Sequence, residues 1–323
     1  QLFTIGSDSK THDESERAKQ FAEALELQQS IWKLNAKEML HYWDEAMNTL
    51  HEPMADFSIL PTYLVSKLAK KKVTVALSGD GGDELFFGYE RFWSVGKNIK
   101  YQQHPSLLRK GIYGFDKYAS GNKKFNAVLL ASRQGEAQQG LNSRFRKEWL
   151  EALAPDLNSI SLPEEYDVYS YSNSKDIGTL LQNMRHSEFY GMMQKTLRKV
   201  DLASMGNSLE VRVPFLDKQM IEASLKIDPL LSYGKNKSKQ VLKNILHKRI
   251  PSVQEETVKK GFSVPLSAWF RADLKPLITE RLLDANLLDF GFERAAIEKM
   301  LKSHGNKEQD LKWPLFTLYA LLK

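Results

Sequence analysis

Seven consecutive residues combine carboxylates, glycines and a hydroxyl in a pattern that could bind a phosphorylated ligand. They occupy residues 78–84 and read SGDGGDE, and we refer to them as the acidic turn. Glycines let backbone N–H groups approach an anion and permit positive φ angles. Carboxylates beside a phosphate require a bridging hard cation, and Mg²⁺ held by one or two carboxylates together with phosphates is the usual arrangement. The same spacing would also suit a turn whose Asp and Gly residues only cap a helix.

The residues on either side of the acidic turn predict a strand before it and a helix after it. Residues 73–77 read VTVAL, an apolar and largely β-branched run that is typical of a strand buried on both faces in a parallel sheet. Leu85, Phe86 and Phe87 open a helix, so the turn lies at a helix N-terminus, which attracts anions. Two common nucleotide motifs are absent, because Glu84 stands where a dinucleotide fingerprint needs its third glycine and no Walker-type P-loop sequence occurs.

The preceding residues alternate strand and helix patterns. Strands are expected at 2–5, 31–34 and 73–77, and helices at 13–27, 35–50 and 62–71. The order β-α-β-α-α-β-α predicts an α/β fold with a parallel sheet and flanking crossover helices. After about residue 94 helical periodicity dominates, with a long amphipathic helix expected at 178–200 and a loop at 133–140. We therefore divide the chain into an α/β core, residues 1–95, and a mostly helical remainder, residues 96–323.

Composition narrows the class of protein. The chain has 323 residues and no cysteine, which excludes disulfides, thiolate zinc sites and a cysteine nucleophile within it. We see neither an apolar run of about 18 residues nor a signal peptide, so a cytoplasmic protein without a membrane partner is expected. The net charge of +6 fits an anionic small-molecule substrate. Nucleic-acid binding is disfavoured, because basic and aromatic residues are not interleaved.

The acidic turn and the residues after it, SGDGGDELFFGYERF, resemble the signature of the asparagine synthetase family, in its ATP-dependent synthetase domain. Three further stretches resemble the same family in the same order. They are DESERAKQFAEAL from Asp13, EPMADFSILPTYLVSKLA from Glu52, and SLEVRVPFLD from Ser208 followed by KKGFSVP from Lys259. The resemblance implies an adenine nucleotide alpha hydrolase-like fold of the pyrophosphate-loop ATPase type.

The resemblance also implies a reaction. The aspartate side-chain carboxylate attacks the α-phosphate of ATP, pyrophosphate leaves, and ammonia derived from glutamine displaces AMP to form asparagine. Three alternatives stay open: a related amidotransferase for another carboxylate, including one on a saccharide; a lactam-forming synthetase; and a non-catalytic interaction module. Asp80 favours amidation over ring closure, because ring-closing relatives tend to lose that acid.

Site residues follow from the positions that match the family. Asp80 would take a proton from ammonia, and Lys259 would neutralise charge on the α-phosphate and the leaving pyrophosphate, with adjacent Lys260 as the alternative. ATP and Mg²⁺ are the implied cofactors. The expected nucleotide contacts are Ile5, Gly6, Ser78, Gly79 and Gly81, and the expected metal carboxylates are Asp83 and its neighbour Glu84.

Two family features do not occur in the sequence. A pyrophosphate loop of the form SGGxDSS is expected before Phe3, and the chain contains none. The glutaminase domain, with its N-terminal cysteine nucleophile, is also absent. We therefore expect residues 1–95 to be a partial nucleotide-binding core without its first strand and loop, and the chain to have little synthetase activity alone. A homodimer is retained as one option for the assembly.

Several charged residues outside the acidic turn are ambiguous. Glu210 and Arg212 alternate along an extended segment, and we expect a structural ion pair rather than a substrate contact. His12, His51 and His186 have no second ligand at a useful spacing, so we interpret them as non-catalytic.

Overall fold

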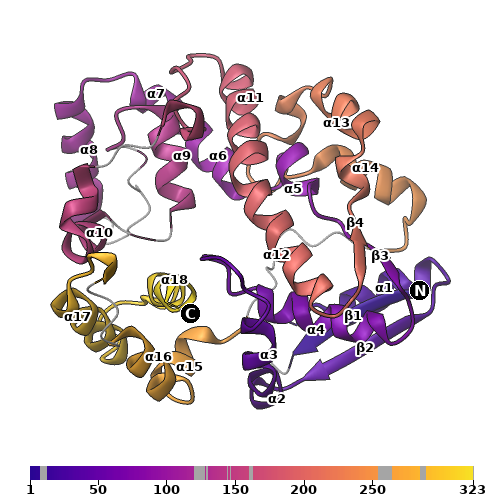
Figure 1. The fold of residues 1–323 in the computed structure, drawn as a ribbon. Helices are drawn as coiled ribbons and strands as arrows, with labels where there is room; N and C mark the ends of the chain where they lie inside the picture. Colours follow the sequence, from indigo (N-terminus) through magenta and orange to yellow (C-terminus); the bar gives the residue numbers. More distant parts are fainter. Residues whose placement is uncertain are drawn as a thin grey trace.

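The computed structural model describes residues 1–7, 13–119, 128, 130–143, 145, 147–159, 163–253, 264–283 and 289–322. These residues form four short strands among many helices (Figure 1). The strands are β1 (Leu2–Ser7), β2 (Gln29–Leu34), β3 (Val75–Leu77) and β4 (Glu210–Arg212). The α-helices are α1 (Ser15–Ala24), α2 (Ala36–His41), α3 (Trp43–Met47), α4 (Ile59–Lys70), α5 (Gly82–Leu85), α6 (Glu90–Gly96), α7 (Ile99–Gln102), α8 (Ser106–Ala119), α9 (Gln134–Asn142), α10 (Lys147–Leu153), α11 (Ile177–Ser187), α12 (Met193–Met205), α13 (Lys218–Leu225), α14 (Gln240–Arg249), α15 (Leu266–Arg271), α16 (Lys275–Leu282), α17 (Arg294–Gly305) and α18 (Lys312–Leu321).

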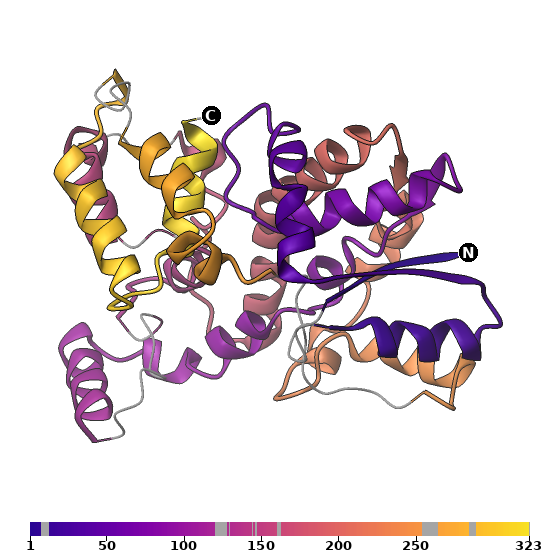
Figure 2. The same cartoon turned by 90° about the horizontal axis from the view of Figure 1, so that it is seen from below.

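The N-terminal elements follow the predicted order, except that the one helix expected at 35–50 is divided at Tyr42 into α2 and α3. β1 and β2 pair in parallel, with Leu2 opposite Gln29 and Ser7 opposite Leu34. The connecting helix α1 packs on one face of this pair and α4 on the other, as Figure 2 shows from below. Asn35 caps the start of α2, because its side chain accepts the N–H groups of Lys37 and Glu38.

The predicted single parallel sheet is replaced by two separate parallel pairs, β1–β2 and β3–β4. The expectation that β3 is buried on both faces is wrong, since 42% of Val75 and 72% of Leu77 are exposed. Within the described residues β3 has a hydrogen-bonded neighbour on one side alone, β4, so one edge and much of its surface face solvent.

Two hydrophobic cores hold the helices together. In the first, helices from the two ends of the chain meet around Trp43, whose ring lies 6.3 Å from that of Trp269 and 6.1 Å from that of Phe316. Trp43 Nε1 also donates a hydrogen bond to the Tyr319 hydroxyl at 3.3 Å. The second core joins α6, α9 and α11, and it begins at Phe87, just after the acidic turn. The turn is therefore attached directly to a packed helical unit.

Helix predictions after residue 96 succeed where periodicity is strong. The long helix expected at 178–200 is confirmed as α11 and α12, which are continuous through a π-helical turn at Glu188–Met192. The loop expected at 133–140 is wrong, because α9 occupies this segment. Its start is stabilised by Glu136, which accepts the N–H of Ser132 at 2.7 Å, and Gly135 allows the helix to pack against the carbonyl of Tyr169. Capping and tertiary packing outweigh the low helix propensity of its glycines.

The helices in the described part of the chain are all too short or too polar to span a membrane.

Candidate active site

The backbone of the acidic turn continues the pairing of β3 with β4. The N–H of Ser78 donates to the carbonyl of Arg212 at 2.9 Å, one position beyond the end of β3. Gly81 then has φ of +85°, a left-handed conformation that favours glycine, and it precedes the first residue of α5. The predicted strand and turn are therefore confirmed. The expectation that Leu85, Phe86 and Phe87 open a helix is wrong, because α5 begins at Gly82 and ends at Leu85, and Phe87 has a φ of +59°. The turn lies at the carboxyl end of a parallel strand, where open α/β folds bind ligands.

Asp80 lies at the start of this turn and is oriented by Ser78. The Ser78 hydroxyl donates to the Asp80 carboxylate, and the Asp80 N–H donates to Ser78 Oγ at 3.2 Å. The Asp80 side chain is only half-buried, so its carboxylate stays accessible to a ligand. An oriented, accessible carboxylate of this kind could accept a proton from an attacking amine.

Asp83, on the first turn of α5, faces a lysine from a distant segment. Its Oδ1 lies 3.0 Å from Nζ of Lys239, and both side chains are partly exposed. Gly88 lies directly against the carboxylate, because a Cβ at that position would fall 1.8 Å from Asp83 Oδ1. The Gly88 N–H also donates to the Asp83 carbonyl at 2.8 Å. Glycine at position 88 is therefore required for Asp83 to hold this orientation.

Glu84 turns away from Asp83 and is buried. Only 2% of the residue is exposed, and its carboxylate accepts a hydrogen bond from the Tyr89 hydroxyl. Burial raises the pKa of Glu84, although the Tyr89 hydrogen bond acts in the opposite direction. Burial and the neighbouring Glu84 likewise raise the pKa of Tyr89. The two predicted metal carboxylates thus lie in different environments.

These surroundings decide which carboxylate could hold a divalent cation. Asp83 fits better, because its side chain is partly exposed although Oδ1 is buried, and Mg²⁺ accepts a single protein carboxylate when phosphate oxygens supply further ligands. Glu84 does not fit, since its buried carboxyl already accepts a hydrogen bond and its environment favours the protonated form. The described residues contain no group of three or more His, Asp or Glu side chains that could hold a metal by themselves.

The other predicted site residues lie elsewhere. Ile5 is 7% exposed and Gly6 is also buried, both on β1, so they belong to the first sheet, whereas the acidic turn follows a strand of the second. A Cβ on Gly6 would lie 2.8 Å from Lys33 Cγ, which gives this glycine a packing reason as well. Lys259 and Lys260 lie outside the described residues.

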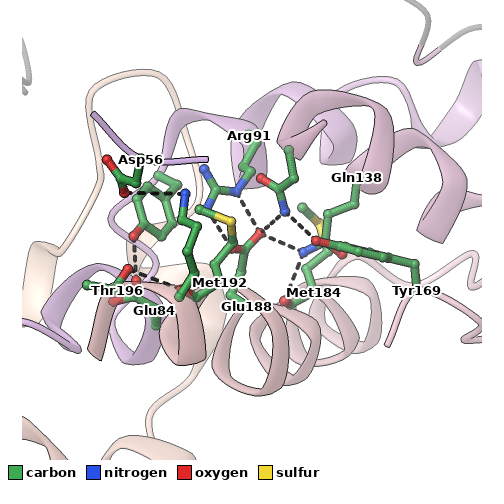
Figure 3. A network of polar contacts seen from close by, with 12 residues as sticks. Asp56, Glu84, Arg91, Gln138, Tyr169, Met184, Glu188, Met192 and Thr196 are labelled. Atoms are coloured by element: carbon green, nitrogen blue, oxygen red, sulfur yellow. Dashed lines mark hydrogen bonds and ion pairs between the residues drawn. The ribbon is translucent and has the colours of Figure 1, made fainter. Parts of the chain in front are cut away.

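The structure contains a buried charged network next to the acidic turn that the sequence did not predict (Figure 3). Glu188, in the π-helical turn, has no exposed surface. Its carboxylate accepts two hydrogen bonds from Arg91, from Nε at 2.6 Å and from Nη2 at 2.5 Å. Gln138 and Asn142 of α9 donate to the same carboxylate at 2.7 and 3.1 Å. This carboxylate is therefore matched by four donors, two of them on a guanidinium.

The network extends back to the acidic turn through one aromatic ring. The Arg91 guanidinium lies 3.6 Å from the centroid of the Tyr89 ring, and the Tyr89 hydroxyl donates to Glu84. The helical core is thus connected to α5, the helix that carries Asp83. Tyr89 and Arg91 lie within the stretch that resembles the family, but the acceptor of Arg91 lies 97 residues away, and no local pattern indicates that pairing.

A second charged cluster lies at the other end of the same view, where α4 begins against α12 (Figure 3). Asp56 is buried, and Nζ of Lys195 lies 3.4 Å from its Oδ2. Ser58 Oγ donates to Asp56 at 2.6 Å and accepts from Lys199 at 3.2 Å. Burial would raise the pKa of Asp56, but Lys199 and Lys195 outweigh it and lower that pKa. Two lysines are thus held next to one buried carboxylate.

The structural ion pair expected on β4 is present. Arg212 Nε lies 3.2 Å from Glu210 Oε1, and both side chains are more than half exposed. His51 and His186 belong to no metal-binding group in the described part of the chain.

Comparison with known proteins identifies a matching family model and several similar proteins. The family model described as Asparagine synthase matches residues 1–323. Asparagine synthetase (glutamine-hydrolyzing) 1 of Bacillus subtilis strain 168 is 25% identical over 327 residues, covering 99% of this chain and 51% of that protein. Asparagine synthetase (glutamine-hydrolyzing) 3 of the same strain is 24% identical over 271 residues, covering 79% of this chain and 39% of that protein. The chain therefore spans about half the length or less of these curated relatives.

Proposed function

Because the chain belongs to the asparagine synthase family, we propose that it is the synthetase part of a glutamine-dependent asparagine synthetase. In this role it adenylates the side-chain carboxylate of aspartate with ATP and then amidates it with ammonia. The observation that carries the proposal is the acidic turn at the carboxyl end of β3, which presents Asp80 and Asp83 as two separately oriented, partly exposed carboxylates.

In the first half-reaction, an oxygen of the aspartate side chain attacks the α-phosphorus of ATP. The bond from that phosphorus to the bridging oxygen of the β-phosphate breaks, and pyrophosphate leaves with the bonding electrons. Mg²⁺ would neutralise phosphate charge at Asp83, and Lys259 would contribute a second positive charge. Gly79 and Gly81 would bring backbone N–H groups to the nucleotide beside Ser78, whose own N–H pairs with Arg212, and Ile5 and Gly6 would contact adenine.

In the second half-reaction, ammonia attacks the acyl carbon of the aspartyl adenylate. The carbon–oxygen bond to AMP breaks, and the nitrogen loses a proton. Asp80 would accept that proton, and the Ser78 hydroxyl orients its carboxylate for the transfer. The remainder of the ATP site and the glutaminase that supplies ammonia would come from the half of the protein that the relatives possess beyond the matched region.

The test is ATP–pyrophosphate exchange in the full-length protein, with aspartate and with a panel containing glutamate, a uronic acid and an N-acyl amino acid. We expect exchange with aspartate, a loss of at least about 100-fold in Asp83→Asn, and no comparable loss in the matched control Glu222→Gln, an exposed carboxylate on α13. Asp80→Asn should retain exchange and lose amide formation. The 323-residue chain alone should turn over little ATP.

Each other outcome points to a different function. Exchange only with another acid would keep the adenylation and change the substrate, which covers the saccharide-modifying and lactam-forming alternatives. Absence of exchange with every acid would refute the enzymatic proposal and leave a non-catalytic interaction module as the better reading.

A further inference from the structure

We infer that helix α8 binds the surface of an anionic lipid bilayer. This surface function is separate from the proposed synthetase reaction and does not depend on it. Two observations carry the inference: α8 turns large apolar side chains to solvent, and the segment that contains it holds much of the net positive charge of the chain.

The exposed side chains of α8 are those that a surface helix normally buries. The exposed fractions are 82% for Leu107, 51% for Leu108 and 74% for Phe115. Leu107, Gly111 and Phe115 follow one another at intervals of four residues, so they lie along one side of the helix, with Leu108 beside them. We call these four residues the apolar stripe. An ordinary surface helix packs such a stripe against the core, whereas α8 turns it away from the protein.

Arg109 holds the opposite side of α8 against the protein. Only 6% of this residue is exposed, its Nε donates to the carbonyl of His104 at 3.1 Å, and its Nη1 donates to the carbonyl of Ala131. Ala131 belongs to the second hydrophobic core. Rotation of the helix to bury the apolar stripe would break these hydrogen bonds, so the fold itself fixes the stripe on the outside.

The apolar stripe is uncovered in the described part of the chain. Apart from adjacent residues and the helix backbone, no described atom lies within 4 Å of the place that a Cβ would take on Gly111 or Gly114. None of the described side chains of α8 belongs to either hydrophobic core. The helix lies at one edge of the molecule in Figure 1 and projects from it in Figure 2. A large partner can therefore reach the stripe.

The charge around α8 indicates that this partner is anionic. Residues 97–119 include five Lys or Arg residues and a single acidic residue, a net charge of +4, compared with +6 for the whole chain. Lys97, Lys100 and Lys110 are exposed, and Lys110 lies one helical turn from Leu107. A second copy of the chain would bring the same positive charge to the contact, so self-association through this face is disfavoured.

An apolar stripe beside exposed lysines fits the boundary between lipid headgroups and acyl chains. Leucine and phenylalanine side chains enter the acyl region, while lysine ammonium groups stay among anionic headgroups. Because Arg109 holds one side of α8 to the protein, a flat surface can cover the other side, whereas a groove that encloses a helix could not. A nucleic acid would pair with the lysines and leave the stripe in water. The expectation of no membrane partner considered spanning segments and signal peptides, and attachment to a bilayer surface requires neither.

The test is sedimentation of the full-length protein with phosphatidylcholine vesicles that contain about 30% phosphatidylglycerol, and with vesicles of phosphatidylcholine alone. We expect binding to the anionic vesicles. Leu107→Gln/Phe115→Gln should weaken it by at least about tenfold, because two large apolar side chains no longer insert. Lys110→Gln should weaken it by about fivefold. The matched controls are Leu225→Gln and Lys218→Gln, which change an exposed leucine and an exposed lysine of α13 and should alter binding by less than about twofold.

The other results would overturn the inference. Absence of binding to the anionic vesicles, or equal binding to the neutral ones, would remove the lipid role of α8. Equal losses in the α8 and α13 variants would assign the binding to the surface as a whole. If light scattering shows a dimer that the double variant dissociates, the apolar stripe joins two copies of the chain instead.

Two further measurements separate this role from folding and from catalysis. The Tm should be unchanged in the double variant and in Lys110→Gln, because the substituted side chains are exposed. A loss of binding confined to variants with a lower Tm would overturn the inference and indicate a structural role. ATP–pyrophosphate exchange should be the same in all variants, so failure of the proposed function and failure of lipid binding are observed independently.

Discussion

Replacing Arg91 with methionine tests whether the buried network behind the acidic turn depends on its charge pair. The substitution keeps an apolar stem of similar length and removes the guanidinium from the Glu188 carboxylate. Glu188 has no exposed surface, and Arg91 is 13% exposed at its side chain, so water cannot replace the missing donors. Gln138 and Asn142 continue to donate to the carboxylate.

The expected loss of stability follows from the burial of that charge. Removing one partner of a buried ion pair typically costs about 3–5 kcal/mol, because the other charge is left uncompensated. Because two amide donors remain on Glu188, we expect a loss of stability near the lower end of this range, about 3 kcal/mol. An exposed pair supplies the matched control: Arg198 Nε lies 2.7 Å from Glu52, with both side chains nearly half exposed. Arg198→Met should therefore cost no more than about 1 kcal/mol.

Urea denaturation followed by tryptophan fluorescence measures both variants, and the chain contains six tryptophans for this purpose. The double variant Arg91→Met/Glu188→Met completes the cycle, and we expect it to be more stable than Arg91→Met alone, since no buried charge remains. If Arg91→Met and Arg198→Met lower the free energy of unfolding by the same small amount, with equal m-values, the argument that burial makes the Arg91–Glu188 pair critical is refuted.

Two further substitutions test the geometry of the site and its charged surroundings. Gly88→Ala should lower stability by about 1–3 kcal/mol and weaken Mn²⁺ binding, because the new methyl group occupies the place of Asp83 Oδ1; unchanged Mn²⁺ affinity would contradict the orientation of Asp83. Asp56→Asn should reduce the dependence of stability on acid pH. Because Lys199 and Lys195 outweigh burial and lower the pKa of Asp56 in the folded state, its contribution is present above the unfolded pKa of about 4 and is lost as pH falls through the folded value. Urea midpoints between pH 7 and pH 3 measure this, and an equally steep decline in the variant would argue against the assignment.

Much of the local structure could be predicted from the sequence, because its causes lie within a few residues of one another. The strand and turn before α5 need only an apolar run and a glycine at position 81, and the start of α2 needs only Asn35 and Glu38. The apolar periodicity that predicted the helix at 178–200 recurs at every helical turn, so it too depends on residues close together in the chain. Residue types and spacing drew attention to the carboxylates of the acidic turn in the same way, whereas their roles came from the family resemblance.

Burial and pairing between distant segments were decided by the tertiary structure. The pattern of residues 73–77 predicts a covered strand, yet Leu77 is exposed, because the cover of a strand is supplied by other segments. The sequence places Asp83 and Glu84 side by side as expected metal carboxylates, and only packing turns one toward Lys239 and the other toward Tyr89. The division near residue 95 stays a prediction.

The sequence by itself therefore determined the acidic turn, its carboxylates and the family resemblance, since each depends on residues close together in the chain. The tertiary structure alone decided which carboxylate is partly exposed, that Lys239 faces it, and that Arg91 is held by Glu188. The physical reason is that a side chain far along the chain becomes a neighbour only when the hydrophobic cores have packed. The spacing of the residues around a site therefore does not predict which distant side chain will contact them.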